Sequence, residues 1–228
     1  MKFLIFMCFL LVSGISHNSA EIKKRSVLKR VVRSTIGQIT TAYTEQLKTY
    51  IIANCVENGF ADIEEDLRKI FTELEECVQT KKIYVHTKEE YLENVEECSK
   101  EPIKKVKGCL TKKQGYFPYF LLNMARKQVE LVYKDREIIT VYMAPCMNVF
   151  ERSEVSYGYI KCLEDTSKKT NDSARIPNSI DQFCSRFLPA LHCLTDIIDK
   201  ECGQEPKVKL YSEDHLRANE YPCQQKYD

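Results

Sequence analysis

The stretch IEEDLRKIFTELEECV, residues 63–78, decides the fold class of this chain. Its apolar side chains recur every three or four residues, which is the spacing of one buried face of an α-helix, and the other positions are mostly charged. Asp62, followed three residues later by Glu65, predicts a capping box where this helix begins. The stretch therefore predicts an amphipathic helix that packs against other helices.

Helical periodicity continues over most of the chain. Thr87 and Glu90 repeat the capping pattern before another apolar face. Pro118 suits a first helical turn, whereas Pro189 falls inside a helical pattern and should kink or split that helix. Residues 137–143 have a strand-like composition but no partner strand, so we interpret them as a helix or a buried connection. The fold class is predicted to be all-α, with further helices around residues 27–53, 103–111, 118–134, 147–163, 179–200 and 212–219.

The N-terminus has the three parts of a secretory signal peptide. Lys2 precedes an apolar run over residues 3–12, and small and polar residues follow as far as Ala20. The run is shorter than the about 20 apolar residues that span a bilayer, and no later stretch is apolar enough to anchor the chain. We expect a signal peptide over residues 1–20, cleaved after Ser16 or Ala20, a basic N-terminal helix over 21–54, and a disulfide-rich helical domain over 55–228 that is secreted to the extracellular space.

Cysteine content agrees with export. The sequence has 11 cysteines, and Cys8 lies in the predicted leader, so an even number remains for disulfide bonds. Their pairing stays open, because sequence alone cannot select among the many combinations. No Cys-x-x-Cys or paired histidine ligand pattern occurs, so we expect no metal and no cofactor. The cysteines expected in bridges are Cys55, Cys77, Cys98, Cys109, Cys146, Cys162, Cys184, Cys193, Cys202 and Cys223.

An internal repeat is one interpretation of the cysteine-containing segments, which would make the domain a stapled helical bundle of two related halves. Cys77 and the lysines after it are echoed by Cys162 and its lysines, Cys98-Ser by Cys184-Ser, and Cys109-Leu-Thr by Cys193-Leu-Thr. If these cysteines are equivalent, they should pair equivalently. Chance similarity among segments rich in lysine and cysteine is the alternative.

The charge balance argues against nucleic acid as a partner. The chain has 34 basic and 33 acidic side chains, whereas binding to phosphate requires clustered positive charge. The basic cluster over residues 23–33 has three interpretations: a solvated helix start, a proteolytic processing site, or a contact with anionic surfaces. The oligomeric state stays open.

No catalytic residues are expected. His86 and His215 are expected to be exposed, and His192 beside Cys193 does not make a nucleophile pair, because adjacent residues on a helix do not face each other. No nucleophile elbow, phosphate loop or dinucleotide fingerprint occurs. A small secreted hydrolase or toxin is the alternative, and it would require one of these histidines to meet a carboxylate.

A stretch rich in aromatic residues suggests a candidate ligand pocket. Large flexible side chains gather where a helix begins, and they could line a cavity for a small apolar ligand or simply fill the core. An extracellular protein-interaction or immune role is a third possibility, to be judged from exposed apolar surface. The candidate pocket residues are Tyr116, Phe117, Phe120, Leu121 and Met124.

These features together resemble a known family. The leader, the ten remaining cysteines, the helical texture and the late series Cys184, Cys193, Cys202 and Cys223 resemble the insect 27 kDa haemolymph glycoprotein family over roughly residues 55–223. The resemblance implies a secreted, circulating protein of haemolymph, without known catalytic residues. Asn171 is followed by Asp and Ser and forms an N-glycosylation acceptor sequence, which is either used or left unmodified.

Overall fold

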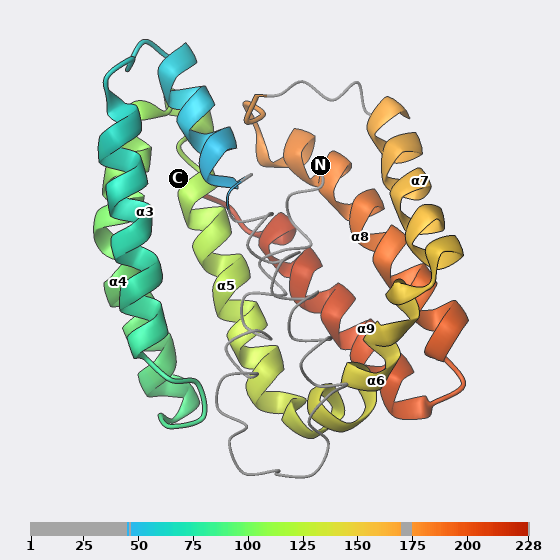
Figure 1. Cartoon of the computed structure of the whole chain (residues 1–228). Coiled ribbons are helices and arrows are strands. Elements are labelled where there is room, and N and C mark those ends of the chain that lie inside the picture. The colour runs from blue at the N-terminus through green and yellow to red at the C-terminus, as the bar shows by residue number, and fades with distance from the viewer. Residues whose placement is uncertain (1–44, 46, 170–174, 228) are drawn as a thin grey trace.

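A computed structural model describes residues 45, 47–169 and 175–227, and within them the chain forms helices and no strand (Figure 1). No helix in these ranges is long and apolar enough to cross a bilayer. The predicted leader, most of the basic N-terminal helix and Asn171 lie outside the described residues. The all-α prediction is confirmed for the part of the chain that the structure describes.

The helices form a bundle in which two helical hairpins lie at opposite edges. α3 (Ile63–Thr80) packs against α4 (Lys88–Cys109) at one edge, and α7 (Ser153–Lys169) packs against α8 (Ile180–Cys202) towards the other. α5 (Phe117–Lys134) and α9 (Pro206–Glu220) pack against each other in the middle. Shorter elements complete the chain: a helical stretch at 47–57, η1 (Lys112–Gln114), η2 (Ile138–Met143), α6 (Ala144–Cys146), η3 (Met147–Glu151) and η4 (Tyr221–Gln224).

Two capping boxes were expected, and one of them is present. The Thr87 amide donates to Glu90 Oε2 at 2.8 Å, and the Glu90 amide donates to Thr87 Oγ1 at 3.2 Å, which confirms the predicted start of α4. Asp62 precedes α3 but makes no side-chain capping bond, so that prediction was wrong. Its backbone, at φ −89° and ψ 4°, is not in the extended conformation that aims a capping side chain at the following amides.

Proline does not break the long helices. Pro118 lies in the first turn of α5 as predicted, but α8 continues through Pro189, and α4 continues through Pro102 where separate helices were expected. A proline within a helix costs about 3 kcal/mol through its missing donor and its ring. In α8 the buried neighbours Phe187 and Leu191 offset that cost, because burying each stabilises by about 1.5–3 kcal/mol.

The segment with strand-like composition forms a π-helix on the path from α5 to α7. η2 buries Ile139 and Met143 and runs directly into α6. The interpretation as a helix rather than a strand is confirmed.

Two apolar clusters form the core, and α5 and α8 pass through both. The first cluster contains Phe117 and Phe120 of α5 with Phe183 and Phe187 of α8, together with Ile51 from residues 47–57. The helical stretch at 47–57 thus crosses the expected boundary at residue 54 and packs into the domain. The second cluster, further along the same helices, contains Val129, Val132, Leu194, Ile198, Val208 and Tyr211.

The five disulfide bonds form two nested pairs and one additional bridge. Cys55–Cys109 encloses Cys77–Cys98 in the first half of the chain. Cys146–Cys202 encloses Cys162–Cys193 in the second half, and the two outer bridges span nearly equal separations of 54 and 56 residues. The additional bridge is Cys184–Cys223. The prediction of a disulfide-stapled helical bundle is confirmed.

The pairing changes the register of the proposed repeat. The sequence matched Cys98 to Cys184 and Cys109 to Cys193, but Cys98 pairs with Cys77 whereas Cys184 pairs with Cys223, so these are not equivalent. The nested order instead matches Cys98 with Cys193 and Cys109 with Cys202. The two halves are related by the topology of their bridges, and the shared Cys-Ser and Cys-Leu-Thr sequences are incidental to it.

Candidate functional site: a groove between α4 and α5

The five residues predicted to line a pocket lie together in the first cluster. Phe117, Phe120 and Met124 are fully buried. The Phe120 ring lies edge-on to Phe183 with centroids 4.8 Å apart, and Phe117 lies edge-on to the same ring at 5.4 Å. These side chains therefore fill the space between α5 and α8.

Tyr116 belongs to this cluster, and Leu121 packs against it. The Tyr116 hydroxyl donates to the Pro177 carbonyl at 3.1 Å, and burial raises the pKa of Tyr116. Leu121 is half-buried and packs against the same cluster. Both residues thus hold the start of α5 against the segment before α8.

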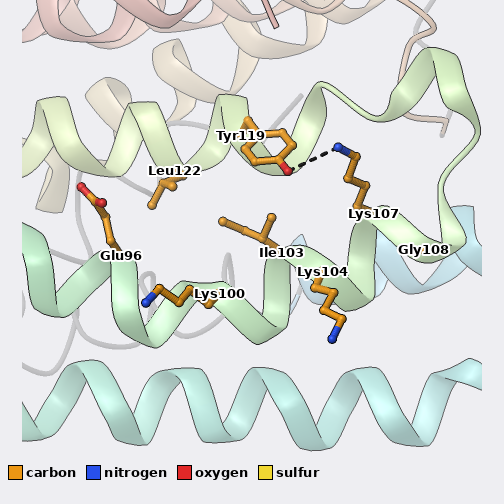
Figure 2. A pocket seen from close by; sticks show the side chains of 8 residues that line it. All are labelled: Glu96, Lys100, Ile103, Lys104, Lys107, Gly108, Tyr119 and Leu122. Atoms are coloured by element: carbon orange, nitrogen blue, oxygen red, sulfur yellow. Dashed lines mark hydrogen bonds between the residues drawn. The ribbon is translucent and has the colours of Figure 1, made fainter. Parts of the chain in front are cut away.

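A groove of about 530 Å³ lies on another face of α5, where it meets α4 (Figure 2). Its floor is apolar: Ile103 of α4 points towards Leu122 of α5, and the Tyr119 ring lies beside them. Neither Tyr119 nor Leu122 was among the predicted pocket residues, although both belong to the same aromatic stretch. The remaining lining residues are Glu96, Lys100, Lys104, Lys107 and Gly108 of α4.

The rim of the groove is cationic. Lys107 Nζ donates to the Tyr119 hydroxyl at 3.3 Å and lies 4.8 Å from the centroid of its ring. Lys100 binds Glu97, whose carboxylate raises the pKa of Lys100 and keeps its ammonium charged. Lys104 makes no hydrogen bond or ion pair with the described residues, and in Figure 2 its side chain extends away from α5.

The one acid in the lining is neutralised. Glu96 forms an ion pair with Arg126 of α5 at the end of the groove opposite Lys107. An apolar floor with unneutralised cations at one end can accept an amphiphilic molecule. Little in the sequence points to this site, because lysines spaced three and four residues apart are also typical of an ordinary solvated helix face.

The three histidines do not form a catalytic group with the described residues. His86 Nδ1 lies 4.0 Å from Glu90 Oε2, beyond hydrogen-bond distance, and His192 is exposed on α8. His215 was expected to be exposed, but only 4% of it is accessible, and its ring stacks on Tyr211 with centroids 5.8 Å apart. Burial lowers the pKa of His215 to about 4, so it is neutral near pH 7.

A buried pair of carboxyl groups lies where α5 meets α9. Asp135 and Asp214 are both buried, and burial together with the neighbouring Asp214 carboxylate raises the pKa of Asp135. Burial opposes the ionisation of Asp214, but hydrogen bonds from Lys134, at 2.5 Å, and from Arg217 outweigh it and lower the pKa of Asp214. Sequence reasoning missed this pair, because its members lie 79 positions apart on different helices.

Neither a metal-ligand cluster in the described residues nor a similar protein points to a role for this chain. Residues 47–169 and 175–227 contain no group of three or more His, Cys, Asp or Glu side chains placed to hold a metal ion. No protein-family model, no curated protein and no solved structure matches this chain.

Proposed function

We propose that this chain is a secreted, circulating, non-catalytic protein that binds a small apolar ligand in the groove between α4 and α5. The observation that carries the proposal is the apolar floor formed by the half-buried side chains of Ile103, Leu122 and Tyr119. Apolar surface in a concave, partly enclosed site favours a ligand that removes it from water.

The extracellular part of the proposal is supported by the cysteines. Five disulfide bonds are typical of proteins made for an oxidising compartment, and each adds about 2–4 kcal/mol by restricting the unfolded chain. The predicted leader over residues 1–20 and the resemblance to haemolymph glycoproteins support circulation in insect haemolymph. Asn171 is the proposed glycosylation site.

Native mass spectrometry of the secreted protein, before and after organic extraction, tests the proposal. We expect a ligand mass that extraction removes, a bridged mass that shows no free thiol, and a glycan that maps to Asn171. Protein that carries no ligand and does not take up an environment-sensitive apolar dye would contradict the binding role.

A role in protein interaction is a second candidate, favoured by one exposed pair. Tyr157 and Ile160 of α7 lie one helical turn apart with 68% and 44% of their surfaces accessible. If this pair is the functional surface, Tyr157→Ser with Ile160→Ser abolishes capture of a partner and leaves uptake of apolar dye unchanged.

A further inference from the structure

We propose that the ligand of the α4–α5 groove is a single-chain anionic amphiphile, such as a fatty acid, whose carboxylate is held by Lys107 and Tyr119. This inference rests on the proposed binding function and specifies the chemistry of the ligand. The acyl chain lies along Ile103 and Leu122 (Figure 2).

The sign of the lining charge selects an anion. Lys100, Lys104 and Lys107 follow one another at four- and three-residue spacing, so all three border the same face of α4. Lys100 is paired with Glu97, but Lys104 and Lys107 have no acidic partner among the described residues, and Glu96 does not balance them because Arg126 neutralises it. A cationic amphiphile would meet uncompensated like charge, whereas an anionic one would gain an ion pair.

The headgroup end is defined by two donors that lie close together. Lys107 Nζ and the Tyr119 hydroxyl are 3.3 Å apart, so one carboxylate can accept hydrogen bonds from both. In the structure Lys107 donates to the Tyr119 hydroxyl. The carboxylate would release the tyrosine hydroxyl to act as a second donor.

The length and volume of the groove suit one extended acyl chain. Glu96 and Lys107 are eleven residues apart on one helix, which corresponds to about 16 Å at a rise of about 1.5 Å per residue. The groove volume of about 530 Å³ lies within the range of about 300–1,000 Å³ that small-molecule sites occupy. The Arg126–Glu96 ion pair closes the end away from the headgroup.

Calorimetric titration of the full secreted chain, stripped of lipid, with dodecanoate, dodecanol and dodecylammonium tests the inference. We expect affinity to fall in that order. Lys107→Gln should weaken dodecanoate about three- to fivefold, the effect of one largely exposed ion pair, and leave dodecanol unchanged. Ile103→Glu should abolish binding of dodecanoate and dodecanol, because it places a charge on the apolar floor.

Lys161→Gln on α7 is the matched control, since Lys161 is exposed and distant in sequence from the groove. Thermal unfolding verifies that each variant is folded; Ile103 belongs to neither core cluster, so its substitution should be tolerated. Equal binding of dodecanoate and dodecanol, with Ile103→Glu abolishing both, would overturn the anionic ligand and leave the apolar binding function standing. Absence of binding by all three probes would overturn both proposals.

Discussion

α4 and α8 are corresponding helices of the two halves, and they differ in how they are covered. Each is the second helix of a hairpin, and each holds one cysteine of the inner bridge and one of the outer bridge. α8 packs extensively against α7 and α9, makes smaller contacts with α6 and η4, and shares ring contacts with α5, whereas the extensive contacts of α4 are with α3 and α5. The same cross-link scheme therefore supports a helix with more neighbours in one half and a helix with fewer neighbours in the other.

The side chains of α4 and α8 agree with this difference in how fully neighbouring elements cover the two helices. α8 is apolar through its middle, with Phe187, Leu191 and Leu194 buried, whereas the corresponding part of α4 carries Lys100 and Lys104. A helix with lysines on its outer face cannot be enclosed without desolvating charge. Disulfide topology thus sets the chain path, and the composition of each helix decides whether its neighbours close over it or leave a groove.

The largest expected contrast between the helices is in core packing. Phe187→Ala in α8 should lower the free energy of unfolding by about 3–5 kcal/mol, because the ring is almost fully buried and contacts Phe120 and Phe183. Ile103→Ala in α4 should cost less than about 1 kcal/mol, since this side chain is partly exposed to the groove. Urea unfolding of the oxidised proteins measures both. Equal costs would mean that α4 is as fully packed as α8.

The inner disulfide bonds of the two halves should differ less in their contributions to stability. Removing Cys77–Cys98 or Cys162–Cys193 by paired Cys→Ala substitution should each cost about 3–4 kcal/mol, because the loops contain 21 and 31 residues. The second loss should be slightly larger, since its loop is longer and Cys193 is more deeply buried than Cys98. Midpoints of urea unfolding decide the order. The reverse order would show that packing at α3 contributes more than the bridge topology predicts.

The stability of the protein should depend on pH through a buried histidine in the second half of the chain. The folded pKa of His215, about 4, lies below its ordinary value of about 6.5, so the unfolded chain binds more protons between these values. The free energy of unfolding should therefore fall as the pH drops from about 6.5 to 4, by roughly 3 kcal/mol. His215→Gln should remove this dependence, and the exposed His192→Gln is its control. A slope that survives His215→Gln would assign it to other groups.

The smallest effect is expected where α5 meets α9. Asp135→Asn should raise the free energy of unfolding at pH 7 by about 1 kcal/mol, because the substitution removes a buried carboxylate with one unpaired oxygen beside Asp214. The folded pKa of Asp135 is raised, so its cost appears as the pH rises above the ordinary aspartate value of about 3.9. Unfolding at pH 7 and pH 3 should show the gain only at pH 7. A loss at pH 7 would mean that the carboxylate is stabilising.

Short-range sequence signals predicted which segments are helical better than they predicted where each helix begins and ends. The capping box at Thr87 was predictable, because its two bonds involve residues three apart. The exposure of His215 was misjudged because its helix was expected to begin at residue 212. Pro206, in the first turn of α9, was the available signal, and it places His215 in mid-helix on a buried face.

The candidate site could be predicted only in part. The aromatic stretch from Tyr116 to Met124 was correctly seen to matter, but helical rotation divides it between a packed core and a groove. Which face becomes hollow depends on the partner: Phe183 and Phe187 of α8 fill one side, and the lysines of α4 leave the other open. Nothing near Tyr119 in the sequence identifies α4 as its neighbour.

The arrangement of bridges also makes the two halves separate covalent rings. In the described chain every disulfide closes within residues 55–109 or within residues 146–223, so the peptide between Cys109 and Cys146 is the sole bonded link. One protease cut after Lys134 or Arg136 would yield two chains that part in denaturant without any reducing agent. The bridges within each half oppose the unfolding of that half, yet hydrolysis of a single peptide bond in the link converts the protein into a heterodimer.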